Sequence, residues 1–308
     1  MLVLDAVLPV FLLIALGALA RRTCLRGGAA ATELNRFVVS IALPALLFSI
    51  LANAEWTALA QPRLALALAG TALAIHLPVV IVSMRRGASL ADASIDGLNA
   101  SYANTGFIGI PLVQLTLGAE ALPGAGLSVV ITACGLFALA LLCIEADRHR
   151  GNGLGRTLRA VLPAILRNPL LLAPALGALV SLAGWRLPAL LAVPVSLLAA
   201  AAGPCALVAL GLFLADDGRT DKAPAAAWTL GTIKLLVQPA VAWLFAVPLL
   251  QLPPLQAQLV VLMALLPTGT GPFMLAERYG RRAALSARVV LITTVLSLVT
   301  ISLHLALH

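Results

Sequence analysis

The chain has 308 residues, of which 61% are hydrophobic and only 10% are charged. An ordinary soluble domain is roughly 45–50% apolar and about 25% charged. A water-soluble fold cannot bury that much apolar surface, so the composition excludes a soluble globular protein and predicts an all-α membrane protein. Each of its helices needs roughly 20 apolar residues to cross a bilayer.

The formal net charge is +8, which would suit a nucleic-acid partner if the basic residues were gathered on one soluble face. They lie instead in short loops between apolar runs, where the positive-inside rule explains them. We therefore expect the lipid bilayer, and no nucleic acid, as a partner. The four cysteines are scattered and form no CxxC pair, so the sequence predicts no metal site, no disulfide framework and no cofactor.

Apolar windows bounded by charge, Gly or Pro predict ten transmembrane helices, near residues 3–20, 35–53, 63–84, 95–117, 124–146, 168–185, 190–215, 226–250, 255–277 and 285–307. The long hydrophilic stretch in the middle suggests three parts: a first five-helix repeat at 1–146, a short cytoplasmic linker at 147–167 and a second five-helix repeat at 168–308. All basic residues except Arg63, Arg186 and Lys234 lie in the loops after odd-numbered spans or within four residues of those loops. Those loops are therefore expected in the cytoplasm, with both termini outside.

Prolines of the two predicted halves recur in one register. Because each half has an odd number of spans, two such halves joined in sequence enter the membrane from opposite sides. We therefore expect two inverted repeats, the architecture with which secondary transporters alternate between two states; the less favoured alternative is a duplication without a transport role. The partners, 160 or 161 residues apart, are Pro9 with Pro169, Pro44 with Pro204, Pro78 with Pro239, Pro111 with Pro272, and also Gly17 with Gly177.

The fourth and ninth spans each carry Gly and Pro at mid-membrane beside hydrogen-bonding side chains. Unwound backbone at that depth survives only where it is buried in protein or lines a cavity, so we expect two broken helices that meet, rather than two simple kinks. The N-terminus of each second half would present free N–H groups and the positive end of a helix dipole, which favour an anion. The predicted substrate-binding residues are Asn104, Thr105, Gly106, Gly109, Pro111, Pro267, Thr268, Gly269, Thr270, Gly271 and Pro272.

These two segments carry a family resemblance that covers the whole chain. Asn104-Thr-Gly-Phe-Ile-Gly-Ile-Pro-Leu112 resembles a signature of the auxin efflux carrier family, and the segment 266–280 is similar to its partner signature late in the chain. The resemblance implies crossed broken helices 4 and 9 in a fold of the bile-acid symporter and sodium/proton antiporter type, a scaffold domain beside a moving domain, an elevator-like mechanism and a homodimer. In the family, equivalents of Asn104, Pro111 and Pro272 surround the substrate carboxylate. Bacterial members, in the inner membrane, include carriers proposed for malonate, malate and related acids.

Three polar residues inside predicted spans are candidates for coupling or charge balance. Lys234 lies about nine residues into the eighth span. It either balances the charge of the anionic substrate, or pairs with a carboxylate of a neighbouring span, or extends its ammonium to the cytoplasmic interface. Gln238 follows one turn later. His76 has nearly the mirror position in the third span, where it either packs or relays protons.

The sequence thus predicts a secondary transporter of small organic anions, with mono- or dicarboxylates as the expected substrates. A Na⁺-coupled organic-anion symporter of the bile-acid type is the closest alternative, because backbone carbonyls at the breaks could hold Na⁺. An anion channel is a second alternative. An enzyme is not expected, because the sequence has no HExxH motif, no GxSxG motif and no pair of mid-membrane aspartates.

Overall fold

The computed structural model describes residues 2–25, 29–53, 61–148, 169–215 and 224–307. Within these ranges the chain is helical, without a single β-strand, and one isolated bridge joins Ala103 to Thr268. The prediction of an all-helical protein is confirmed for this part of the chain. Most of the predicted linker at 147–167 lies outside the described residues.

The first half contains α1 (Leu2–Thr23), α2 (Ala30–Phe37), η1 (Val38–Ala42), α3 (Leu43–Ala52), α5 (Pro62–Arg85), α6 (Leu90–Ser101), η2 (Thr105–Gly109), α7 (Ile110–Thr116), η3 (Ala119–Ala121), α8 (Leu122–Val129), η4 (Val130–Leu136) and α9 (Phe137–Arg148). The second half contains α11 (Pro169–Leu182), α12 (Ala189–Leu214), α13 (Pro224–Thr232), η6 (Ile233–Val237), α14 (Gln238–Leu244), η7 (Phe245–Leu249), α15 (Pro254–Leu265), α16 (Gly271–Arg278) and α17 (Ala283–Leu307).

Six helical segments of the described chain are long and apolar enough to cross a membrane, and three shorter apolar helices accompany them. The long ones are Ala30–Ala52, Pro62–Arg85, Ala119–Arg148, Ala189–Leu214, Ala225–Leu249 and Ala283–Ala306. Large hydrophobic side chains such as Leu179, Leu190 and Leu197 point outward and are mostly exposed. Water would make such a surface unstable, whereas the hydrocarbon of a bilayer accepts it.

Several prolines follow directly on a wide helical turn. Pro44, Pro111 and Pro239 each lie within two residues of the end of a π-helical segment, namely η1, η2 and η6. Proline has no N–H to donate and its ring clashes with the preceding turn, and local π adjustments are one way in which membrane helices accommodate it. Only these three prolines of the predicted register mark such a local change, because Pro78 and Pro204 lie inside continuous α-helices.

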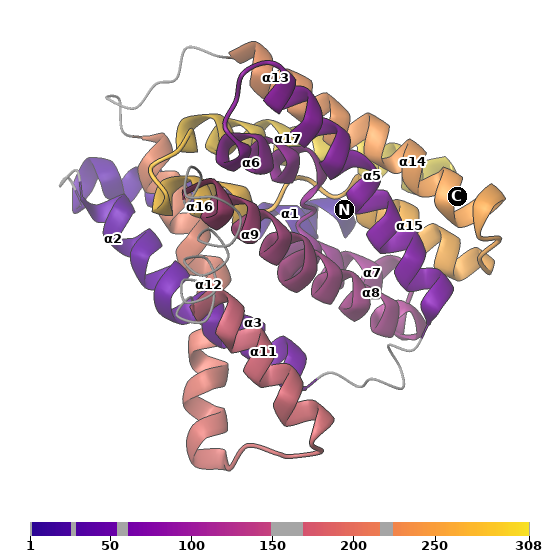
Figure 1. Ribbon diagram of the computed structural model, residues 1–308, viewed down its shortest axis with the longest axis horizontal. Coiled ribbons are helices and arrows are strands. Elements are labelled where there is room, and N and C mark those ends of the chain that lie inside the picture. The colour runs from indigo at the N-terminus through magenta and orange to yellow at the C-terminus, as the bar shows by residue number, and fades with distance from the viewer. Residues whose placement is uncertain (1, 26–28, 54–60, 149–168, 216–223, 308) are drawn as a thin grey trace.

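The helices form two groups. Figure 1 shows α3, α11 and α12 set apart at the lower left, and α1 joins this first group through its contact with α12. In the first group, α1 packs on α12 and α3 packs on α11, each through a glycine. A Cβ atom at Gly17 of α1 would lie 2.2 Å from the carbonyl oxygen of Val208, and one at Gly177 of α11 would lie 2.4 Å from that of Phe48. Such backbone contact is possible only for glycine, which is why small residues lie at helix contacts in membranes. The second group contains α5 to α9 and α13 to α17.

Candidate substrate site

The helices are interrupted at two places that lie against each other. α6 ends at Ser101 and η2 begins at Thr105, while α15 ends at Leu265 and α16 begins at Gly271. The two unwound stretches are joined by backbone hydrogen bonds. The N–H of Asn104 donates to the carbonyl of Pro267 at 2.8 Å, and the N–H of Gly269 donates to that of Tyr102 at 2.9 Å. These bonds satisfy part of the exposed backbone and hold the two breaks in register.

A cavity of about 190 Å³ lies beside this contact. Its walls come from both helix groups, since α3 and α12 form one side and the interrupted segments, with α8 and η4, form the other. Most of the lining is apolar, as in most small-molecule sites, with a few polar groups to orient the ligand. The lining residues are Leu43, Leu46, Ile50, Tyr102, Ala103, Asn104, Thr105, Gly106, Phe107, Ile110, Val129, Ala133, Ala202, Ala206, Gly269, Thr270, Gly271 and Met274.

Unpaired backbone donors gather at this cavity. Among the described residues, the N–H groups of Gly106, Thr270 and Gly271 have no hydrogen-bond acceptor, and all three residues line the cavity. Gly106 is in the first turn of the helix 105–116, and Gly271 is the first residue of α16. Two helix N-termini thus direct free donors and positive dipole ends at one space, an arrangement that favours a bound anion.

Three polar side chains add to these donors. The Oδ1 atom of Asn104 caps the second half-helix by accepting a hydrogen bond from the N–H of Phe107 at 3.3 Å. That orientation leaves its Nδ2 group without an acceptor in the described chain. The hydroxyl groups of Thr105 and Thr270 likewise make no hydrogen bond to described residues, although both side chains are buried. All three can therefore hydrogen-bond a ligand without losing an existing partner.

Comparison with known proteins matches the whole chain to one family. The model of the family described as "Membrane transport protein" matches residues 2–153 and again residues 154–305. The chain belongs to this family, which is that of the auxin efflux carriers. A similar protein of Rhizobium meliloti (strain 1021), named "Putative malonate transporter", is 29% identical over 297 residues, covering 96% of this chain and 92% of the relative. The chain is accordingly a multi-pass membrane transporter, and the family resemblance read from its two signatures is confirmed.

The structure brings about half of the predicted binding residues of this transporter to the cavity. Asn104, Thr105, Gly106 and the stretch Gly269–Gly271 line it. Two more stabilise the contact between the breaks without lining the cavity: the Pro267 carbonyl accepts the N–H of Asn104, and the Thr268 hydroxyl donates to the carbonyl of Asn99 at 2.8 Å. The remaining three predicted residues, which are Gly109, Pro111 and Pro272, do not line the cavity either.

The three predicted coupling residues lie outside this cavity as well. Lys234 is fully buried, and its ammonium donates to the carbonyl of Ala264 at 2.7 Å, so it does not snorkel to an interface. Gln238 donates through Nε2 to the carbonyl of Ser101 at 3.0 Å. His76 is buried with Nδ1 at 3.5 Å from the Ser101 hydroxyl. These side chains support the ends of the half-helices rather than the cavity itself.

Several residues that line the cavity were not predicted from the sequence. The Tyr102 ring lies against the glycines of the other break, since a Cβ atom at Gly271 would lie 2.8 Å from its Cζ atom. Phe107 lies against α12, where a Cβ atom at Gly203 would lie 2.2 Å from its Cε1 atom. Tyr102 stands within the motif of the fourth span and could have been suspected. Leu43 and Ala206 could not have been predicted, because the sequence does not distinguish an apolar residue that faces a cavity from one that faces lipid.

Ion pairs at the charged end of the second helix group tie the loop after α16 to two other helices. Arg282 pairs with Asp96 of α6 at 2.6 Å, and Arg281 lies 3.5 Å from Asp92. In the same loop the Tyr279 hydroxyl donates to Glu145 of α9 at 2.6 Å, and burial raises the pKa of this phenol to about 12. The phenol therefore stays a neutral donor at any physiological pH. These contacts fasten α6, α9 and α16 into one unit.

Filling the cavity from its apolar side tests its role without touching the breaks. Ala206 of α12 is buried and lines the cavity. Ala206→Phe should abolish transport and remove the rise in melting temperature that a bound carboxylate gives, because only a ligand that reaches the native site stabilises it. Ala200→Phe, on an exposed face of the same helix, should behave as wild type. A substrate-induced shift of unchanged size in Ala206→Phe would show that the anion binds elsewhere.

Proposed function

We propose that this transporter is a carrier of small mono- or dicarboxylate anions that works by elevator-like alternating access. One observation carries the proposal: the free N–H groups of Gly106, Thr270 and Gly271, from two interrupted helices, line one cavity together with Asn104. A carboxylate accepts several such hydrogen bonds at once, and helix dipoles compensate its charge where water is scarce. None of the residues lining the cavity is basic, so the backbone is the main source of positive potential.

Ten helices in two inverted repeats, 1–146 and 168–308, are part of the proposal. The glycine contacts support it. If the two halves are equivalent, α1 corresponds to α11 and α3 corresponds to α12, so the contact of α1 with α12 corresponds to the contact of α11 with α3. Gly17 and Gly177, 160 residues apart in the sequence, occupy equivalent places in these two contacts. The two successive matches of the family model, each about half the chain, also fit a duplicated unit.

The elevator-like motion is proposed from the position of the cavity between the two helix groups. α1, α3, α11 and α12 would form the scaffold, and the ion-paired unit with the two breaks would move against it. Anion and half-helices would then travel together, while the apolar wall of Leu43 and Ala206 stays behind. The resemblance further suggests a homodimer in a bacterial inner membrane, with both termini outside.

The substrate class follows from the donors and from the relative. The Rhizobium meliloti protein is named for malonate, a dicarboxylate small enough to place one carboxylate at the donors of each half-helix. We therefore expect malonate and similar short dicarboxylates to bind better than longer or uncharged analogues. Monocarboxylates would use only part of the donor set.

Counterflow in proteoliposomes tests this function directly. Vesicles containing the purified protein are loaded with unlabelled malonate, and the uptake of a trace of labelled malonate is followed. A carrier accumulates the label transiently above its equilibrium level, since each exit of unlabelled substrate returns a binding site. Uptake that only approaches equilibrium and does not saturate would indicate the anion channel. No uptake of any short carboxylate tried would remove the proposal.

A further inference from the structure

Lys234 places its ammonium group in the interior of the protein. Its side chain is 0% exposed, and its single hydrogen bond to the described chain is the one donated to the carbonyl of Ala264. It forms no ion pair with a carboxylate of the described residues. A charge buried in this way is costly unless the surroundings compensate it. Its retention at this depth therefore calls for a function.

The compensation comes from the end of a half-helix. Ala264 is in the last turn of α15, which ends at Leu265, beside the second break. The last four carbonyls of a helix have no partners within it, and the dipole makes that end negative. In broken-helix transporters the same kind of end coordinates a coupling Na⁺ or proton. Lys234 thus places a covalently attached cation where a mobile one could bind.

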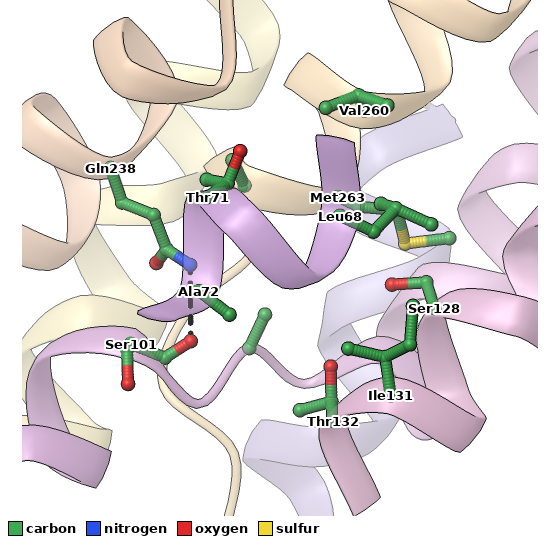
Figure 2. Close-up of a pocket in the computed structure, with 12 residues that line it drawn as sticks. Leu68, Thr71, Ala72, Ser101, Ser128, Ile131, Thr132, Gln238, Val260 and Met263 are labelled. Carbon is green, nitrogen blue, oxygen red and sulfur yellow. Dashed lines mark hydrogen bonds between the residues drawn. The ribbon is translucent and has the colours of Figure 1, made fainter. Parts of the chain in front are cut away.

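A small cavity with apolar and polar lining residues adjoins this place (Figure 2). Ala264 and Gln238 line its wall, as do four hydroxyl side chains: Thr71, Ser101, Ser128 and Thr132. The Oε1 atom of Gln238 and the hydroxyl of Thr71 have no partner among the described residues. The volume is about 20 Å³, and a single water needs roughly 10–15 Å³.

This cavity suits a water molecule better than a metal cation. It has polar oxygens, but none of its lining residues is an aspartate or a glutamate. The ammonium of Lys234 is bonded to Ala264 in the same wall, so a second positive charge there would be repelled in a medium of low dielectric. A neutral water can instead donate a hydrogen bond to the Oε1 atom of Gln238, which has no partner among the described residues.

We infer that Lys234 is a built-in cation that takes the place of a coupling Na⁺ at the crossing of the two interrupted helices, and that the carrier therefore transports its anion without Na⁺. The inference rests on the proposed function, in which the half-helix N-termini bind the anion. It adds that Lys234 compensates the negative C-terminal end of α15 at the same crossing. Lys234 is a positioning residue, because it acts on the end of α15 and does not reach the substrate cavity.

The first test replaces Na⁺ by choline on both sides of proteoliposomes during malonate counterflow. The inference predicts equal rates in the two media, and a loss of about tenfold or more without Na⁺ would overturn it. Absence of counterflow in both media would contradict the proposed carboxylate function instead.

The second test removes the cation and supplies it again. Lys234→Met keeps the length of the side chain without the ammonium, and Lys234→Ala leaves room for a small amine. Both variants should lose transport by about tenfold or more, as expected for a lost charge-assisted hydrogen bond. Ethylammonium in the buffer should raise the rate and the melting temperature of Lys234→Ala but of neither Lys234→Met nor wild type. Arg63→Met, which removes an exposed positive charge at the start of α5, is the matched control and should keep full activity.

Each outcome of the second test supports or overturns the role of Lys234. Wild-type transport by Lys234→Met would show that the ammonium is dispensable, and a Lys234→Ala protein indifferent to ethylammonium in both measurements would show that no cation belongs at Ala264. If neither variant can be purified as a folded protein, the comparison of Na⁺ with choline on the unchanged protein still tests the inference.

Discussion

Asn104→Ala should weaken the binding of malonate to the purified transporter by about ten- to hundredfold, because a hydrogen bond to a charged group contributes about 1.5–3 kcal/mol. The side chain has two tasks at this position. Its Oδ1 atom caps the half-helix through the N–H of Phe107, and its Nδ2 group remains available to the anion. The substitution therefore removes one donor and loosens the N-terminus that supplies another.

Titration calorimetry on detergent-solubilised protein measures this loss. Asn53→Ala is the control, since Asn53 is an exposed asparagine that bonds the carbonyl of Ser49 at the end of α3. Its affinity should equal that of wild type. An Asn104→Ala protein with unchanged affinity would remove Asn104 from the site and would leave the backbone donors as the only candidates.

Gly211→Leu is expected to destabilise the fold more than any substitution in the cavity. A Cβ atom at Gly211 of α12 would lie 2.0 Å from the carbonyl oxygen of Ile14 and 2.9 Å from the N atom of Ala18 in α1. Overpacking usually costs about 1–3 kcal/mol when side chains can move aside, but here the obstacle is backbone and the two helices must separate. We expect little folded protein after extraction and a melting temperature lowered by several degrees.

The matched control is Gly135→Leu. A Cβ atom at Gly135 meets nothing within 4 Å, and the residue is exposed in η4, so a leucine there should be tolerated. If the proposed inverted repeat is right, Gly177→Leu on the contact of α11 with α3 should be as damaging as Gly17→Leu on that of α1 with α12. A stable Gly211→Leu protein would contradict the close packing of α1 on α12.

The interrupted segments could be located from the sequence because Gly and Pro inside an apolar span indicate a break in the helix, whereas apolar side chains give no such indication. Glycine is common at interruptions because of its backbone freedom, and the structure has a helix start at or beside Gly106 and Gly271. The prolines were a poorer guide to the ligand site. Pro272 lies in the first turn of α16, where proline is favoured, whereas Pro111 lies within the half-helix 105–116, just after η2. Neither proline lines the cavity.

The far wall of the cavity could not be predicted from one sequence. Leu43 and Ala206 are apolar residues on helices that are apolar all round, so no periodicity separates the face toward the cavity from the face toward lipid. The partner of Lys234 was equally hidden. A carbonyl acceptor such as that of Ala264 is present at every residue, and only the folded chain shows which one the ammonium reaches.

The position of the bound anion decides whether the two half-helix N-termini form the substrate site. A crystal structure with bromomalonate, in which the anomalous signal of bromine marks the ligand, would show this position. We expect bromine density in the cavity between α12 and the two breaks, with carboxylate oxygens about 3 Å from the N–H groups of Gly106 and Gly271. Ligand density at a place that no half-helix N-terminus faces would contradict the proposed site.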